Sequence, residues 1–176
     1  MNSLFKQHRI VLTLLVSMYI VTTLTWQYLT SGVPAHHLFA DPSLPKISNW
    51  WGLAILPLYS WVLTSLITKQ YGAHFPKKIW LQFSAAGLYA LIITVLFYTG
   101  HQNLVAMLAV PTILIAALFF PVYQAAFLLG YVVVSSYGFG AFLPAVFGLV
   151  FAAMAWVVHK LVRLVARYLF KARVGK

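Results

Sequence analysis

The chain has 176 residues, of which 62% are apolar and only 7% are charged. A soluble domain carries about 45–50% apolar and about 25% charged residues, so this chain cannot cover a surface that faces water, and its solvent must be lipid. The formal net charge is +11, from 12 Lys and Arg residues against one acid, Asp41. The sequence contains no cysteine, which excludes disulfides, thiolate metal sites and a cysteine nucleophile.

Six segments are apolar enough to cross a bilayer core of about 30 Å, for which a helix needs roughly 20 residues. We therefore predict an all-α, polytopic integral membrane protein that forms a single domain with six transmembrane helices. The fourth and fifth segments are the shortest, and a re-entrant pair is the alternative for them. In chain order the predicted spans are Ile10–Leu29, Asn49–Thr68, Ile79–Thr99, Asn103–Phe120, Val122–Tyr137 and Ala141–Val162.

The basic residues predict the orientation. If the N-terminus lies inside, the inner segments hold 11 of the 12 Lys and Arg residues, and the outer segments hold only Lys46. Basic residues resist translocation, so this distribution predicts an N-in/C-in protein of a bacterial inner membrane. It also accounts for the charge without a nucleic-acid partner. A cleaved signal peptide is the alternative for the first span, but its apolar run is longer than the roughly 7–15 residues of a signal peptide.

Histidines and the single acid gather in segments predicted to face outward. His36, His37 and Asp41 lie in the first outer connection, and His101 lies in the second. Imidazole and carboxylate groups are good ligands for zinc or copper, so this cluster is a candidate cation site. The alternative is a solvated loop in which Asp41 pairs with Lys46, and the sequence leaves the metal unknown.

The polar residues inside the predicted spans are neutral. Ser and Thr mostly satisfy the carbonyls of their own helix, whereas the amide of Gln82 needs several partners and is expected to face a helix, water or a ligand. Pro57 and Pro111 each remove a helix hydrogen bond, and ordinary kinks are the simplest interpretation. The candidates for a shared cavity are Tyr59, Gln82, Ser84, Tyr89, Tyr131 and Ser135.

Small residues form a stripe along the sixth span, at spacings of four, three, four and three. Small side chains let helix backbones approach closely in lipid. The contact is expected within one chain, in a homo-oligomer or with another membrane protein. The stripe consists of Ala141, Ala145, Gly148, Ala152 and Ala155.

The last span continues into a basic tail over residues 163–176. Basic side chains at the inner leaflet attract anionic lipid at about 1 kcal/mol each, which makes anionic lipid the predicted partner. A plain stop-transfer anchor is the alternative. The basic residues that share one helix face are Lys160, Arg163, Arg167 and Lys171.

Function is less determined than topology. Phosphate-loop, dinucleotide-binding, metalloprotease and serine-hydrolase motifs are missing, and no cofactor is predicted. The leading hypothesis is a small channel, carrier or substrate-binding transport subunit for a neutral or weakly polar solute. The rival is a non-enzymatic assembly or regulatory subunit of a larger membrane complex, and a metal-dependent enzyme of the outer face ranks third. The size is similar to that of six-helix substrate-binding subunits of vitamin importers. Convergence of Gln82 and the hydroxyl residues on one cavity would favour transport.

Overall fold

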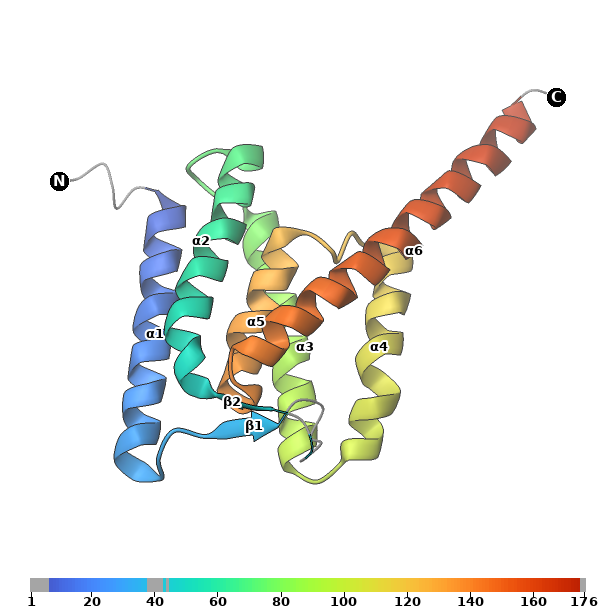
Figure 1. The fold of residues 1–176 in the computed structure, drawn as a ribbon. Helices are drawn as coiled ribbons and strands as arrows, with labels where there is room; N and C mark the ends of the chain where they lie inside the picture. Colours follow the sequence, from blue (N-terminus) through green and yellow to red (C-terminus); the bar gives the residue numbers. More distant parts are fainter. Residues whose placement is uncertain (1–6, 38–42, 44, 175–176) are drawn as a thin grey trace.

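The computed structural model describes residues 7–37, 43 and 45–174. Consecutive helices run in opposite directions, so the beginning of the first helix and the end of the last lie at the same end of the bundle (Figure 1). A short hairpin and one 3₁₀ turn join the first two helices. The elements are α1 (His8–Thr30), β1 (Ala35–His37), β2 (Lys46–Ser48), η3 (Asn49–Trp51), α2 (Gly52–Tyr71), α3 (Lys77–Tyr98), α4 (Gln102–Phe119), α5 (Ala125–Phe139) and α6 (Phe142–Val174).

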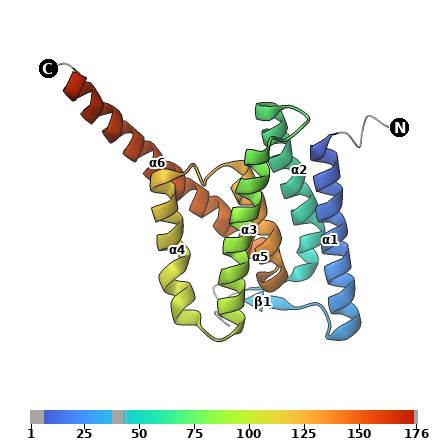
Figure 2. The ribbon, with the colours of Figure 1, turned by 180° about the vertical axis from the view of Figure 1, so that it is seen from behind.

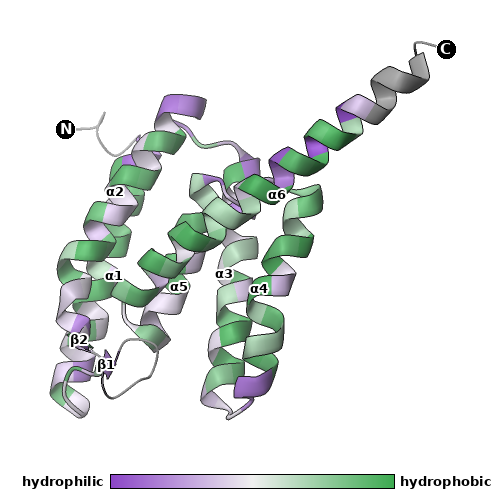
Figure 3. Cartoon of the chain, turned by 45° about the vertical axis from the view of Figure 1, so that its right-hand side comes forward, coloured by the Kyte–Doolittle hydropathy of each residue, from purple (hydrophilic) through white to green (hydrophobic). Residues whose placement is uncertain are grey.

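Five helices are long and apolar enough to cross a membrane: α1, α2 with its preceding turn, α3, α4 and the first part of α6. Many of their large apolar residues are exposed, and the most hydrophilic residues lie toward the two ends of the helices (Figure 3). The predicted all-helical, membrane-type architecture is therefore confirmed. The helices α2 and α4 both continue through their internal prolines, Pro57 and Pro111.

The fifth helix differs from its prediction in length and in position. α5 has 15 residues, about 22 Å at 1.5 Å per residue, which is shorter than a hydrocarbon core of about 30 Å. It packs against α2, α3 and α6. A helix that is surrounded by protein need not match the thickness of the bilayer. Its buried residues are Ala126, Leu129, Gly130, Val132, Ser135, Ser136 and Gly138.

The closest helix contact joins α3 and α5, and it depends on glycine. A Cβ atom at Gly130 would overlap the backbone carbonyl of Phe83. A Cβ at Gly138 would lie 2.7 Å from the Thr94 side chain, and the Tyr98 hydroxyl donates to the Gly138 carbonyl at 3.1 Å. The predicted stripe on the sixth span is therefore not the tightest contact in the molecule.

The hairpin lies across the end of the bundle where α1 ends and α2 begins, with His36 paired to Ile47 (Figure 1). Directly after it, Asn49 is buried, and its backbone N–H donates to the Pro34 carbonyl at 3.0 Å. Gly140, in the α5–α6 turn, has φ +69° and lies against the Asn49 side chain, where a Cβ would collide. Asn49 therefore connects the hairpin to the turn that precedes α6.

The fourth helix is peripheral. Of its 18 described residues α4 buries only Ala117, and it packs more extensively on α6 than on α3, its neighbour in sequence. α6 is 33 residues long, about 50 Å. It crosses one side of the α3–α4 pair and extends past the bundle, as the two opposite views show (Figures 1 and 2).

Candidate functional site: a cavity among four helices

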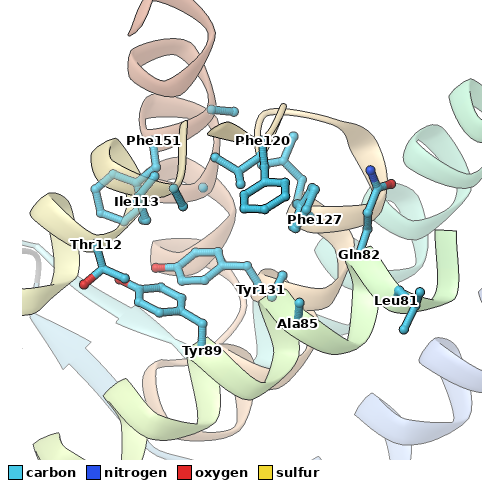
Figure 4. Close-up of a pocket in the computed structure, with 16 residues that line it drawn as sticks. Leu81, Gln82, Ala85, Tyr89, Thr112, Ile113, Phe120, Phe127, Tyr131 and Phe151 are labelled. Atoms are coloured by element: carbon cyan, nitrogen blue, oxygen red, sulfur yellow. The ribbon is translucent and has the colours of Figure 1, made fainter. Parts of the chain in front are cut away.

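A cavity of about 410 Å³ lies between α3, α4, α5 and α6 (Figure 4). α4 packs more extensively on α6 than on α3. The space between α3 and α4 is therefore lined by side chains and is not filled by a close contact of the two helices. Ligand cavities typically measure about 300–1,000 Å³ and are mostly apolar, with a few polar groups. The lining residues are Leu81, Gln82, Ala85, Ala86, Tyr89, Thr112, Ile113, Ala116, Phe120, Val122, Phe127, Leu128, Tyr131, Gly148, Phe151 and Ala152.

At one end of the cavity the polar group is the amide of Gln82. This side chain is 7% exposed, and its Nε2 donates to Gln124 Oε1 at 2.7 Å. Its own Oε1 is buried and has no hydrogen-bond partner among the described residues. A buried amide atom without a partner costs about 1–3 kcal/mol. Rotating both amides by 180° leaves an N–H group unpaired in the same place, so the deficit does not depend on their assignment.

At the other end the polar groups are hydroxyls. Figure 4 shows the oxygens of Tyr89, Thr112 and Tyr131 gathered on the side of the cavity away from Gln82. The Tyr89 hydroxyl donates to the Ala109 carbonyl at 2.6 Å and so ties α3 to α4. The rings of Tyr131 and Phe151 lie edge to face with centroids 6.0 Å apart. The cavity therefore has an aromatic middle, with hydroxyl groups at one end and the side chain of Gln82 at the other.

Three of the six residues predicted for a cavity line this one: Gln82, Tyr89 and Tyr131. Ser84 lies exposed on another face of α3. Ser135 is buried outside the cavity and donates to the Tyr131 carbonyl at 2.7 Å.

Tyr59, the sixth predicted residue, packs with Tyr131 against the apolar core. Its buried hydroxyl has no partner in the described part of the chain.

The aromatic residues of the lining were not among the predicted ones. Phe120, Phe127 and Phe151 stand in uniformly apolar stretches, where an aromatic ring that faces a cavity looks the same as one that faces lipid. Only their position between four helices distinguishes them.

The small-residue stripe, which begins one residue before α6, faces the interior of the chain. Ala141, Ala145 and Ala155 are buried, whereas Gly148 and Ala152 line the cavity. A Cβ at Gly148 would lie 3.3–3.4 Å from side chains of α5. Within the described residues, the stripe thus contributes to the α5–α6 contact and to one wall of the cavity.

A histidine that was not among the predicted site residues fixes α4 to α6. His159 is 4% exposed, and its Nδ1–H donates to the Ala117 carbonyl at 2.8 Å. Carbonyls in the last turn of a helix have no partner within that helix. His159 therefore satisfies one of them and holds the end of α4 against α6.

The histidines predicted to lie at the outer face do not form a cluster with one another in the described structure. His36 and His37 are neighbours in β1, where successive side chains point to opposite faces, and burial lowers the pKa of His36. His101 Nδ1 lies 3.0 Å from Thr99 Oγ1. Among the described residues no three His, Cys, Asp or Glu side chains lie close enough together to hold a metal ion, and Asp41 lies outside these residues.

The basic face of the tail is helical. Lys160, Arg163 and Arg167 are exposed on α6 beyond the cavity. Lys171 belongs to the same helix, but its side chain lies outside the described part of the structure. Attraction to anionic lipid stays a prediction.

Fold and cavity together define an all-helical protein of the multi-pass membrane type with an internal apolar site. Comparison with models of known protein families, with curated proteins and with solved structures gave no match.

Proposed function

We propose that the chain is a carrier, or the substrate-binding subunit of a transporter, for a small neutral or weakly polar solute, and that the four-helix cavity is its binding site. The supporting observation is that Gln82, Tyr89 and Tyr131 converge on one cavity. The lining contains no Asp, Glu, Lys, Arg or His. A charged solute would lose its hydration there without a counter-charge, which is costly, so the cavity favours a neutral one.

The experiment that tests this function blocks the cavity. The protein would be extracted in mild detergent and its native mass measured for a retained small molecule. Ala152→Leu extends a side chain from the cavity wall, whereas Ala153→Leu, on the exposed side of α6, is the matched control. We expect the parent and Ala153→Leu to retain the same solute and Ala152→Leu to lose it. Retention by all three proteins would disprove the assignment, and a bound protein partner with no solute would favour an assembly subunit.

We further propose that all six helices cross a bacterial inner membrane with both termini inside. The support is the 11-to-1 distribution of basic residues and the alternating helix directions (Figure 1). Because the chain has no cysteine, Ser43→Cys and Lys77→Cys can each be labelled alone. We expect an impermeant thiol reagent on intact cells to label position 43 and not 77. The reverse result would invert the topology.

A further inference from the structure

The cavity opens through the gap between α3 and α4, on the outside of the bundle. Leu81 and Phe120 both line it, yet they are 70% and 60% exposed. Ala85 and Thr112 also combine lining with exposure. Because α3 and α4 are both long and apolar enough to cross a membrane, this opening faces lipid.

The opening has the form of a groove along the two helices. On α3 its edge runs from Leu81 through Ala85 to Tyr89, in a row with one residue per turn (Figure 4). On α4 the lining residues also include an alanine, Ala116. From Leu81 to Tyr89 the edge is about 12 Å long, and one leaflet contributes about half of a hydrocarbon core of about 30 Å. An acyl chain of a single leaflet is therefore long enough to lie along the groove.

Two lysines lie at one end of this groove. Lys77 and Lys78 begin α3 and are exposed. They precede Leu81 by four and three residues, which places them one turn before it on the same side of the helix. The described residues contain no Asp or Glu, so neither ammonium group has a carboxylate partner among them. After Lys78 the next basic residue is Lys160, so the groove is basic at one end only.

From the side opening, the length of the groove and the lysines at one end of it, we infer that one anionic phospholipid binds in the α3–α4 gap and closes the cavity on that side. Its phosphate contacts Lys77 and Lys78, and one acyl chain lies along Leu81 and Ala85. The lipid belongs to the leaflet at which α3 begins. This inference goes beyond the proposed function and does not rest on it, because a lipid can complete the cavity wall whether or not a solute is carried.

The apolar and the charged part of the groove each select one part of this occupant. An unfilled gap would forfeit van der Waals contacts on one side, and mostly apolar edges do not offer the several polar partners that an ordered water needs. A hydrocarbon chain is the filling that the bilayer supplies. The lysines then select the headgroup, since basic residues near a membrane surface attract anionic lipid. Trp80 is 39% exposed in the same turn, and indole rings prefer the headgroup level.

Photolabelling of the full chain in phosphatidylcholine nanodiscs tests the inference. The two probes, each added in trace amount, are phosphatidylglycerol and phosphatidylcholine with the same diazirine at the middle of one acyl chain. Mass spectrometry of peptides locates the label. We expect phosphatidylglycerol to label the two edges, residues 81–89 and 112–120, about five- to thirtyfold more than phosphatidylcholine, because each lysine contributes about fivefold near a membrane surface.

Charge variants test the headgroup contact. Lys77→Gln with Lys78→Gln removes both charges, and Arg163→Gln with Arg167→Gln, on an exposed part of α6, removes the same charge elsewhere. We expect the first pair to reduce labelling by phosphatidylglycerol to the level of phosphatidylcholine, and the second pair to leave it unchanged. Lys77→Arg with Lys78→Arg should keep the preference. Labelling by phosphatidylcholine, which needs no charge, reports that the groove is still folded. If it is lost in the double variant, the two single Gln variants carry the comparison, each with about a fivefold loss.

A second pair of variants tests the chain contact. Ala85→Phe fills the groove at its middle, and Ser84→Phe, at an exposed position of α3 outside the cavity lining, is the matched control. We expect Ala85→Phe to reduce labelling of both edges by both probes, and Ser84→Phe to leave it unchanged.

Three results would overturn the inference. Equal labelling of the edges by the two probes in the parent would remove the selection of an anionic headgroup. A preference that is lost with Arg163 and Arg167, and not with Lys77 and Lys78, would place the lipid on α6. Unchanged labelling of the edges in Ala85→Phe would show that no acyl chain lies in the groove.

Discussion

The helix α3 makes two neighbouring contacts of opposite character. Gly87 of α3 faces α5, and Gly130 and Gly138 of α5 face α3, so the two backbones lie very close together. Toward α4, which follows it directly in sequence, α3 presents Leu81 and Tyr89, and the two helices enclose a cavity. The comparison teaches that closeness in sequence does not decide which helices pack tightly, because the size of the facing side chains does.

The difference has an energetic meaning in lipid. Lipid tails are as apolar as leucine, so helices associate through van der Waals contact and interhelical hydrogen bonds rather than through the hydrophobic effect. The α3–α5 contact provides close van der Waals contact along its length. α4 buries a single residue among its 18 and is held by the hydrogen bonds from Tyr89 and His159. We regard α3–α5 as the scaffold and α4 as the adaptable wall of the site.

The largest effect is expected from Gly130→Ala. One added methyl group must displace the Phe83 backbone, which has no rotamer to change, so the destabilisation should reach or exceed the upper end of the roughly 1–3 kcal/mol typical of overpacking. The melting temperature in detergent measures it. Tyr137→Leu, at a 60% exposed position of α5, should melt like the parent. A parent-like melting temperature for Gly130→Ala would show that the scaffold is looser than its geometry indicates.

Gly148→Leu should have the next largest effect, about 1–2 kcal/mol, because the neighbours that it meets are side chains of α5, which can rotate. The new side chain also enters the cavity, so a retained solute should be lost. Val150→Leu, on the exposed face of α6, is the control for the melting temperature. Since the Gly148 contact lies within one chain, the native mass should keep its subunit number. A shift toward monomer would place the stripe between protomers instead.

Two conservative variants compare the scaffold and the adaptable wall directly. Tyr98→Phe removes a hydrogen bond from α3 to α5, and Tyr89→Phe removes one from α3 to α4. Interhelical hydrogen bonds average about 0.6 kcal/mol, so both melting temperatures should fall little. Hydrogen exchange should separate them, with faster exchange in α4 for Tyr89→Phe and no local change in α5 for Tyr98→Phe. Equal behaviour of the two would remove the distinction.

The smallest effect is expected from His36→Ala combined with His37→Ala. Both residues lie in the short hairpin outside the helices, so the melting temperature should change by an amount that corresponds to no more than about 0.5 kcal/mol. Elemental analysis of the purified protein provides the second measurement. Loss of a stoichiometric metal from the double variant would establish the outer cation site that the sequence only suggests.

The sequence by itself determined the membrane-type helices and most of their limits. The first span was predicted as Ile10–Leu29 and the helix is His8–Thr30, and the third was predicted as Ile79–Thr99 and the helix is Lys77–Tyr98. Such limits are local, because they are set by the length of an apolar run and by the charges and prolines that flank it. The expectation that Gln82 faces a polar partner was equally local, since an amide in an apolar helix needs partners wherever it points, and its Nε2 donates to Gln124.

Only the tertiary structure decided which faces meet. It packed the short helix α5 against three other helices, placed Gly130 against Phe83, left Ser84 exposed and brought three phenylalanine rings together around a cavity. In a soluble helix the polar face marks the outside, and the hydrophobic period therefore reveals the core. In this chain lipid and core are equally apolar, so a residue such as Phe127 carries no sign of which one it faces until the helices are packed.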